Sequence, residues 1–131
     1  IDTSKTPIGT VLMDEGGVKV TYNGVEMHGI GDTPMIYFLF SIENNSEHTI
    51  QVIASDASIN DVMKYMMSGS GLEIQPGKKA AEKFAPTNLW ETGIETINDI
   101  AKLVKFEFTL SVKNTEEYET LFTTDAITIY P

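Results

Sequence analysis

The chain has 131 residues, which fits one domain of ordinary size, and its 41% hydrophobic content is enough for a core. Its nine basic residues are all Lys and its acidic residues number 19, so the net charge is −10. The negative net charge and the absence of Arg, whose planar guanidinium binds phosphate, argue against nucleic acid and anionic membrane surfaces as partners. The absence of Cys excludes disulfides, thiolate nucleophiles and Cys-based metal sites.

The sequence predicts one domain with a short polar extension. Residues 1–7 are interpreted as a polar N-terminal tail or linker, of the kind that remains when a targeting region is removed, and residues 8–131 as a single β-sandwich domain. The longest apolar run, at 35–40, is far shorter than the roughly 20 residues that a membrane helix needs. Neither a signal peptide nor an internal repeat is evident in these letters.

The first strands are predicted from alternation and turn residues. An apolar run at 8–13 precedes a turn at 14–17, and the alternating residues 18–22 indicate a half-buried strand. Asn23-Gly24 then favours a type I′ hairpin, with 25–27 as the return strand. The alternative is a bulge within one longer strand. Residues 28–34, rich in Gly and Pro, are interpreted as a loop.

Residues 35–54 contain the strongest strand signal. Ile36, Phe38, Phe40 and Ile42 share one face, and the other face also has apolar residues in its middle. This pattern predicts a strand that lies centrally in its sheet and is covered on both sides for part of its length. A turn at 43–48 and a return strand at 49–55 are expected to follow.

The second half of the chain is predicted to continue as short strands with one helical crossover. The strands are expected at 62–67, 78–84, 104–112, 118–123 and 127–130, with a flexible connection at 68–71 and a turn at Pro76-Gly77. In the strand at 104–112, the alternating apolar residues are predicted to point inward and to face the series from Ile36 to Ile42 across the core; they are Val104, Phe106, Phe108, Leu110 and Val112. Residues 88–103 show helical spacing, with Ile94, Ile97 and Ile100 at intervals of three, and predict a short helix or helical turn that crosses between sheets. Strand count and turn spacing together favour an all-β sandwich over a βαβ domain.

No catalytic residue is predicted. Gly69-Ser70-Gly71 superficially resembles a nucleophile elbow, but that motif needs Gly where this chain has Ser68. The carboxylates Glu116, Glu117 and Glu119 are interpreted as a solvated turn and strand edge. The chain is therefore expected not to be an enzyme.

No metal or cofactor site is predicted either. His28 and His48 are expected to be solvent-exposed residues of polar loops, without the spacing of a zinc site. An acidic calcium site from Asp32, Asp56 or Asp61 remains an alternative, although the segment from 56 onwards fails the EF-hand pattern. A second alternative is a Cu(I) site, because thioether ligands suit soft metals; the residues concerned are Met63, Met66 and Met67. We favour a core role for these methionines.

Two further features have alternative interpretations. Trp90 is expected to be buried, plugging one end of the sandwich, because Leu89 precedes it and an isoleucine series follows. If it were exposed, it would be a good anchor for a partner or a sugar ring. The triplet 44–46 is interpreted as a turn, although Asn44 and Ser46 also match a glycosylation acceptor.

Several segments, taken together, resemble a group of bacterial cell-envelope domains. They are Ile42-Glu-Asn-Asn-Ser-Glu-His-Thr-Ile50, Ala57-Ser-Ile-Asn60, Pro76-Gly-Lys-Lys79, Gly93-Ile-Glu-Thr-Ile-Asn-Asp-Ile100 and Phe106-x-Phe108. The domains they resemble are immunoglobulin-like β-sandwiches of unknown function in lipoproteins of Gram-positive gut bacteria. There they follow a lipidated cysteine and a Ser/Thr-rich spacer, or a zinc ribbon and a membrane anchor.

The resemblance implies an immunoglobulin-like β-sandwich of about seven to nine strands with one short helix, located on the bacterial cell surface or secreted. It implies no catalytic residues. We therefore expect a non-catalytic extracytoplasmic module that binds a protein or glycan partner or acts as a spacer. Contact with a membrane would come only through a lipid anchor, which this sequence does not contain. The alternative is an envelope protein that binds copper or calcium.

Overall fold

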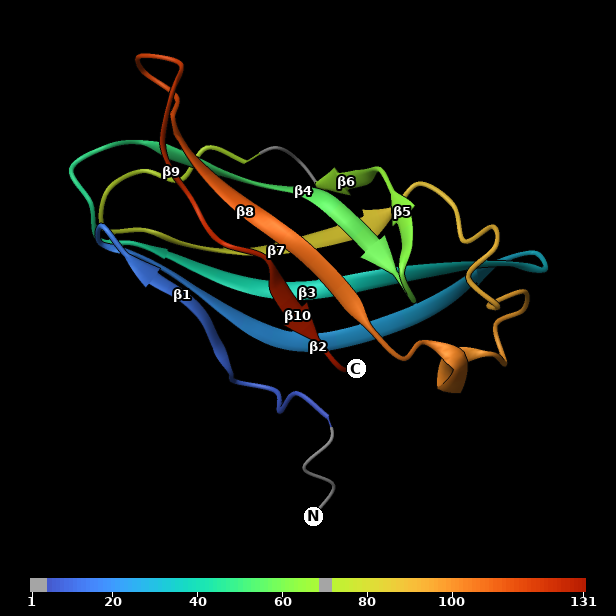
Figure 1. Cartoon of the computed structure of the whole chain (residues 1–131). Coiled ribbons are helices and arrows are strands. Elements are labelled where there is room, and N and C mark those ends of the chain that lie inside the picture. Colours follow the sequence, from blue (N-terminus) through green and yellow to red (C-terminus); the bar gives the residue numbers. More distant parts are fainter. Residues whose placement is uncertain (1–4, 69–71) are drawn as a thin grey trace.

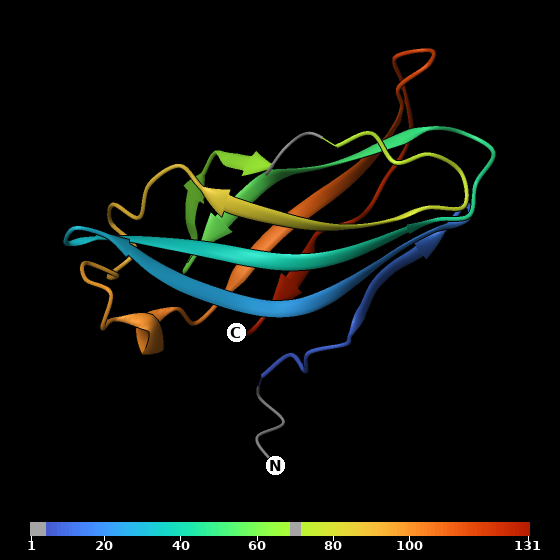
Figure 2. The same ribbon diagram turned by 180° about the vertical axis from the view of Figure 1, so that it is seen from behind.

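The protein folds as two antiparallel β-sheets packed face to face (Figures 1 and 2). The structure is a computed structural model, which describes residues 5–68 and 72–131. The strands in this part are β1 (Val11–Glu15), β2 (Val18–Ile30), β3 (Thr33–Asn44), β4 (Ile50–Ile59), β5 (Val62–Lys64), β6 (Met66–Ser68), β7 (Lys79–Pro86), β8 (Phe106–Asn114), β9 (Glu119–Thr123) and β10 (Ile127–Ile129). The predicted all-β sandwich is confirmed.

The strand order is that of an immunoglobulin-like sandwich. One sheet has the order β1-β2-β3-β7-β6, and the other has the order β10-β8-β4-β5, with β9 also paired to β8. An immunoglobulin constant domain places strands A, B, E and D in one sheet and C, F and G in the other. Here β2-β3-β7-β6 corresponds to A-B-E-D, and β4, β8 and the final strands take the places of C, F and G.

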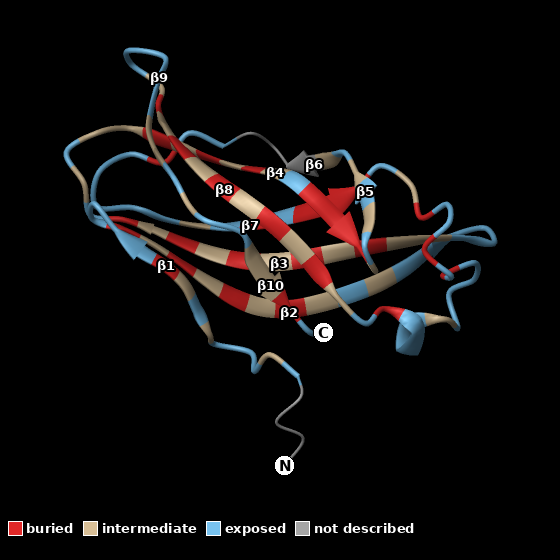
Figure 3. Ribbon diagram, in the orientation of Figure 1, coloured by how far each residue is buried: buried red, intermediate tan, exposed pale blue. Residues whose placement is uncertain are grey.

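Aromatic side chains from both sheets form the centre of the core. Phe38 of β3 stacks on Phe106 of β8, with ring centroids 3.8 Å apart, and Phe40 approaches Phe108 edge-on at 5.8 Å. All four side chains are at most 1% exposed, and Figure 3 shows buried positions alternating along β3 and β8, so the expected facing layers of these two strands are confirmed. Val104 was predicted to belong to the same inward series, but it is 63% exposed because β8 begins only at Phe106.

The second strand contains a β-bulge in place of a hairpin. β2 runs unbroken from Val18 to Ile30, and its register against β3 shifts between Tyr22 and Gly24. The inward positions are even-numbered before the bulge and odd-numbered after it, since Tyr22 pairs with Phe40 whereas Val25 pairs with Phe38. The hairpin interpretation is therefore wrong, and the bulge alternative is confirmed.

The segment 28–34 is strand and turn, not a loop. The ladder between β2 and β3 continues to the pairs Gly29–Pro34 and Ile30–Thr33, and the chain reverses at Gly31 and Asp32. A Cβ atom on Gly29 would lie 2.7 Å from Cγ2 of Ile97, which rests on this strand. Gly29 thus marks a close approach between the hairpin and the segment that follows β7.

The strand β4 does not pair with β3, although the two are consecutive. β3 lies between β2 and β7 in one sheet, as its predicted central position requires, but β4 pairs with β5 and β8 in the other sheet. The turn after Asn44 therefore carries the chain from one sheet to the other. The face of β3 opposite the core, with Tyr37 and Leu39, is half-buried, so the expectation of cover on both faces is wrong.

The segment predicted as helical is mostly an irregular crossover. Between β7 and β8, the structure contains one turn of 3-10 helix at Ile100–Lys102. Glu91 (φ 68°) and Gly93 (φ 90°) have left-handed backbone conformations, which an α-helix cannot include. The segment does cross between the sheets, as predicted. Within the described ranges, no helix is long and apolar enough to span a membrane.

The strand predicted at 62–67 is divided between the two sheets. Its first part, β5, pairs with β4, and its second part, β6, pairs with β7. Tyr65 lies at the break, and its carbonyl accepts a hydrogen bond from the Thr87 N–H at 2.9 Å. This contact brings the chain after β7 alongside the β5–β6 corner.

Candidate ligand-binding site at one end of the sandwich

A pocket of about 690 Å³ lies at the end of the sandwich that carries the β2–β3 turn. Its lining comes from residues 32–35 of that turn and the start of β3, and from residues 87–91 and 93–95 of the crossover after β7. In Figure 1 the β2–β3 turn and the crossover lie at the same end, away from the β8–β9 turn. The volume is within the range of small-ligand pockets, roughly 300–1,000 Å³.

Trp90 stands at this pocket and is 76% exposed. The prediction that it plugs the sandwich is wrong, because the neighbouring Leu89 and Ile94 are the residues that turn inward and are buried. The alternative interpretation, an exposed aromatic anchor, fits the structure. An exposed Trp beside a concave surface offers a large rigid contact area at low entropic cost.

The backbone on both sides of Trp90 is fixed by Lys64 and Asn88. The Lys64 Nζ donates to Asn88 Oδ1 and to the Trp90 carbonyl, both at 2.7 Å. The Trp90 N–H also donates to Asn88 Oδ1, at 3.1 Å. Lys64 belongs to β5, so the strand framework holds the peptide groups of this exposed residue in place.

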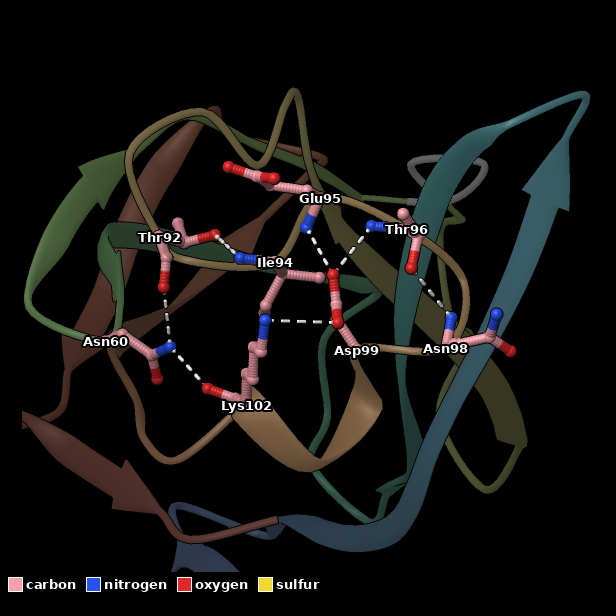
Figure 4. A network of polar contacts seen from close by, with 8 residues as sticks. All are labelled: Asn60, Thr92, Ile94, Glu95, Thr96, Asn98, Asp99 and Lys102. Carbon is pink, nitrogen blue, oxygen red and sulfur yellow. Dashed lines mark hydrogen bonds and ion pairs between the residues drawn. The ribbon is translucent and has the colours of Figure 1, made fainter.

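A second support comes from Asn60, in the two-residue turn between β4 and β5 (Figure 4). Its Oδ1 accepts from the N–H groups of Val104 (2.8 Å) and Lys105 (3.1 Å). Its Nδ2 donates to the carbonyls of Thr92 (3.0 Å) and Lys102 (2.7 Å). One side chain thus satisfies four backbone groups spread along the crossover. Asn60 and Asp61 both have positive φ, which is the geometry of a type I′ hairpin turn.

Asp99 binds residues on both sides of itself in the middle of the crossover. Its Oδ2 accepts from the N–H groups of Glu95 (3.0 Å) and Thr96 (2.9 Å), and its Oδ1 lies 3.3 Å from the Lys102 Nζ (Figure 4). The two backbone hydrogen bonds, with help from Lys102, lower the pKa of this carboxyl to about 2. Side-chain hydrogen bonds therefore replace the regular backbone pairing that a helix would have provided.

We expect Asn60→Gly to loosen the crossover while keeping the turn, because Gly accepts the positive φ of position 60. Loss of four hydrogen bonds to backbone, partly replaced by water, should lower the free energy of unfolding by about 2 kcal/mol. Amide exchange at Val104 and Lys105 should accelerate more than exchange in β3. A matched variant, Asn45→Gly, changes an exposed Asn in the turn at the other end and should leave both measurements nearly unchanged. Equal effects of the two variants would contradict the role of Asn60.

Three exposed carboxylates line the pocket. Asp32 comes from the β2–β3 turn, and Glu91 and Glu95 come from the crossover. In Figure 4 the Glu95 carboxylate points away from the network that holds its backbone N–H. Among residues 5–68 and 72–131, none of the three takes part in an ion pair. The pocket therefore combines an exposed indole with uncompensated negative charge.

The two histidines differ in position, exposure and contacts. His28 lies on β2 and not in a loop, but it is exposed as predicted; its Nε2 is 3.0 Å from Glu26 Oε2. His48 does lie in the turn after β3, where it is half-buried, with its Nδ1 3.3 Å from Nδ2 of Asn114. They belong to different ends of the strands and share no partner.

The candidate metal ligands do not converge in the described part of the chain. Asp32 lies at the β2–β3 turn, Asp56 at the bulge of β4, and Asp61 forms an ion pair with Lys105 at 2.6 Å. There, no group of three or more His, Asp or Glu side chains could hold a metal ion. Met63 is 65% exposed, contrary to the core role expected for it, whereas Met66 packs against the core. The side chain of Met67 is outside the described set, so the copper alternative stays a prediction.

The carboxylates near the β8–β9 turn and the triplet after β3 have the structural roles that the sequence predicts. Glu116, Glu117 and Glu119 are exposed at the β8–β9 turn, as predicted. Asn44 is only 1% exposed; its Oδ1 accepts from Ser46 in the turn, and its Nδ2 donates to the carbonyls of His48 in the turn and of Ile74 further along the chain. The turn interpretation is therefore confirmed, and the nitrogen is inaccessible for glycosylation in the folded chain. Ser70 lies outside the described residues.

The fold and the pocket define a class of protein: an immunoglobulin-like β-sandwich with an aromatic, acidic pocket at one end. No protein-family model matches the chain, and no curated protein matches it either. The site must therefore be interpreted from its own chemistry. The sequence suggests unrelated roles for Trp90 and Asp32, because their juxtaposition depends on the β2–β3 turn meeting a crossover more than fifty residues further along the chain.

Proposed function

We propose that this protein is a non-catalytic binding module, which holds its partner at the pocket beside Trp90. The single observation behind the proposal is that a largely exposed Trp is held by its backbone at the rim of a pocket, through Lys64 and Asn88. Exposing the apolar indole ring to water is unfavourable, and a bound partner that covers the ring removes this unfavourable hydration. The domain would act outside the cytoplasm, on the bacterial surface or secreted. The resemblance of its turn and strand segments to cell-envelope domains supports that location.

The location has a direct test in the residues that precede Ile1 in the gene. A secretion signal followed by a lipidation cysteine is the expected result. An upstream cytoplasmic enzyme domain joined to Ile1 without a signal would contradict the location, and it would leave the binding site itself untouched.

Binding can be tested with the protein's own fluorescence, because Trp90 is the sole Trp. The probes are soluble neutral oligosaccharides and short peptides of either charge. At least one probe should shift the emission of Trp90 to shorter wavelength as the indole leaves water. In calorimetry, Trp90→Ala should weaken that binding at least about tenfold, equivalent to about 1.4 kcal/mol.

Tyr118→Ala is the matched control, since Tyr118 is an aromatic residue that is even more exposed (91%) and lies at the β8–β9 turn. It should bind the probe with the affinity of the unaltered protein. Failure of every probe class to bind, or equal weakening by both variants, would overturn the proposal.

A further inference from the structure

We propose that the pocket recognises a positively charged side chain, Lys or Arg, presented by a peptide segment of a protein partner. This inference rests on the proposed function and names the chemistry of its ligand. The pocket combines two features that suit such a side chain: an exposed indole with apolar neighbours, and carboxylates at the rim. A cationic side chain uses both at once, because its stem is aliphatic and only its end is charged.

The apolar part of the pocket accommodates the stem. Leu89 and Ile94 are buried beneath it, and Pro34 and Met35 form half-buried walls on the side of β3. Trp90 adds a ring face, over which an ammonium or guanidinium group gains a cation–π interaction. A volume of about 690 Å³ exceeds what one Lys or Arg side chain fills, so neighbouring residues of the peptide also fit.

The charge in the pocket is of one sign. All the ionisable side chains that line it are carboxylates: Asp32 on one side, and Glu91 and Glu95 on the other. Lys64 Nζ also reaches the crossover, but it donates to Asn88 Oδ1 and the Trp90 carbonyl and forms no ion pair with a pocket carboxylate.

Some carboxylates elsewhere in the described chain are paired with a lysine, unlike these three. Glu43 pairs with Lys79 at 2.9 Å, Asp99 pairs with Lys102 at 3.3 Å, and Lys105 lies between Asp61 (2.6 Å) and Glu107 (3.0 Å). These lysines are engaged with other acids, and among the described residues no base pairs with the three pocket carboxylates. Charge complementarity of this kind steers encounter and selects against acidic partners.

The test uses a short peptide with a central Lys, the same peptide with that Lys acetylated, and a neutral oligosaccharide of similar size. Trp90 fluorescence reports binding at about 0.01 M and about 1 M salt, where the screening length changes from about 30 Å to about 3 Å. We expect the Lys peptide to bind, the acetylated peptide to bind at least tenfold more weakly, and high salt to weaken the Lys peptide by a similar factor.

Two triple variants separate the pocket from the general negative field of the protein. Asp32→Asn with Glu91→Gln and Glu95→Gln should weaken the Lys peptide at least tenfold. Glu116→Gln with Glu117→Gln and Glu119→Gln removes the same charge from the β8–β9 turn and should change binding less than twofold. All six side chains are exposed, so denaturant melts should confirm that both variants fold.

The outcomes distinguish this inference from the proposed function. Salt-insensitive binding of the oligosaccharide alone, lost in Trp90→Ala, would overturn the cationic ligand and leave the binding module standing. Equal loss in both triple variants would show unspecific attraction and would also overturn it. Absence of binding by all three probes would count against the pocket as a binding site.

Discussion

Phe108→Ala should lower the free energy of unfolding by about 3–5 kcal/mol, the range for removing a fully buried aromatic ring. Phe108 is 1% exposed and lies between two other rings: Phe106, with centroids 4.4 Å apart, and Phe40 from the opposite sheet. It is therefore part of the contact between the sheets. Neighbouring strands cannot close the resulting cavity, because β8 is held between β4 and the final strands on both sides.

Denaturant unfolding measures the effect, with the midpoint falling and the slope unchanged. Tyr118→Ala removes an aromatic ring from the exposed turn that follows β8 and should change the stability by less than about 0.5 kcal/mol. If Phe108→Ala cost less than about 1 kcal/mol, the assigned packing of β8 would be wrong.

Asn44→Ala is expected to cost about 3 kcal/mol, a large effect for one polar residue. The Asn44 Nδ2 donates to the carbonyls of His48 (2.7 Å) and Ile74 (2.8 Å), and its Oδ1 accepts from the N–H (2.9 Å) and hydroxyl (2.6 Å) of Ser46. Alanine would remove one of the donors to each of these carbonyls and would take the Asn44 acceptor away from the Ser46 N–H, all at a nearly buried position. The unfolding free energy from a denaturant melt is the measurement.

Asn44→Asp adds a pH dependence with a definite sign. The new oxygen would face two carbonyl oxygens, so the folded state favours the protonated carboxyl and raises its pKa above the value in the unfolded chain. Stability relative to the unaltered protein is then retained below the unfolded-state pKa and lost as the pH rises through the folded-state pKa. The difference between the two proteins should therefore be larger at pH 7 than at pH 4.

Asn45→Asp supplies the control, because it places the same charge on the exposed neighbouring residue. It should show little difference between the two pH values. A pH-independent loss in Asn44→Asp would mean that the side chain is hydrated, contrary to the hydrogen bonds assigned to it.

The strands that could be predicted were those whose alternation is set by burial alone. β3 and β8 each place an aromatic or aliphatic residue at every second position, and each such series is buried. The bulge in β2 also has a signal in the letters, since the apolar positions shift from even (Val18, Val20) to odd (Val25, Met27) across Asn23-Gly24. That shift of phase is the local signature of a bulge, because one extra residue moves the inward positions to the other parity.

The predictions that the structure contradicts concern residues whose partners lie far along the chain. Ile94, Ile97 and Ile100 repeat as in a helix, yet Ile94 is buried, Ile97 rests on Gly29 and Ile100 is exposed. The crossover takes its shape from Asn60 and Asp99, and a local period contains no information about such contacts. The pairing of β4 with β8 and the exposure of Trp90 could not be predicted from the sequence for the same reason.

The same Asn turn ends a buried strand in each of the two sheets. Ser-Ile-Glu-Asn44 ends β3 and Ser-Val-Lys-Asn114 ends β8, and in both places the Asn oxygen accepts the N–H two residues further on, at 2.9 and 3.0 Å. His48 joins the two copies, because its carbonyl accepts from Asn44 and its ring lies beside the amide of Asn114. The same four-residue pattern therefore ends one buried strand in each sheet, and His48 links the two strand ends across the sandwich.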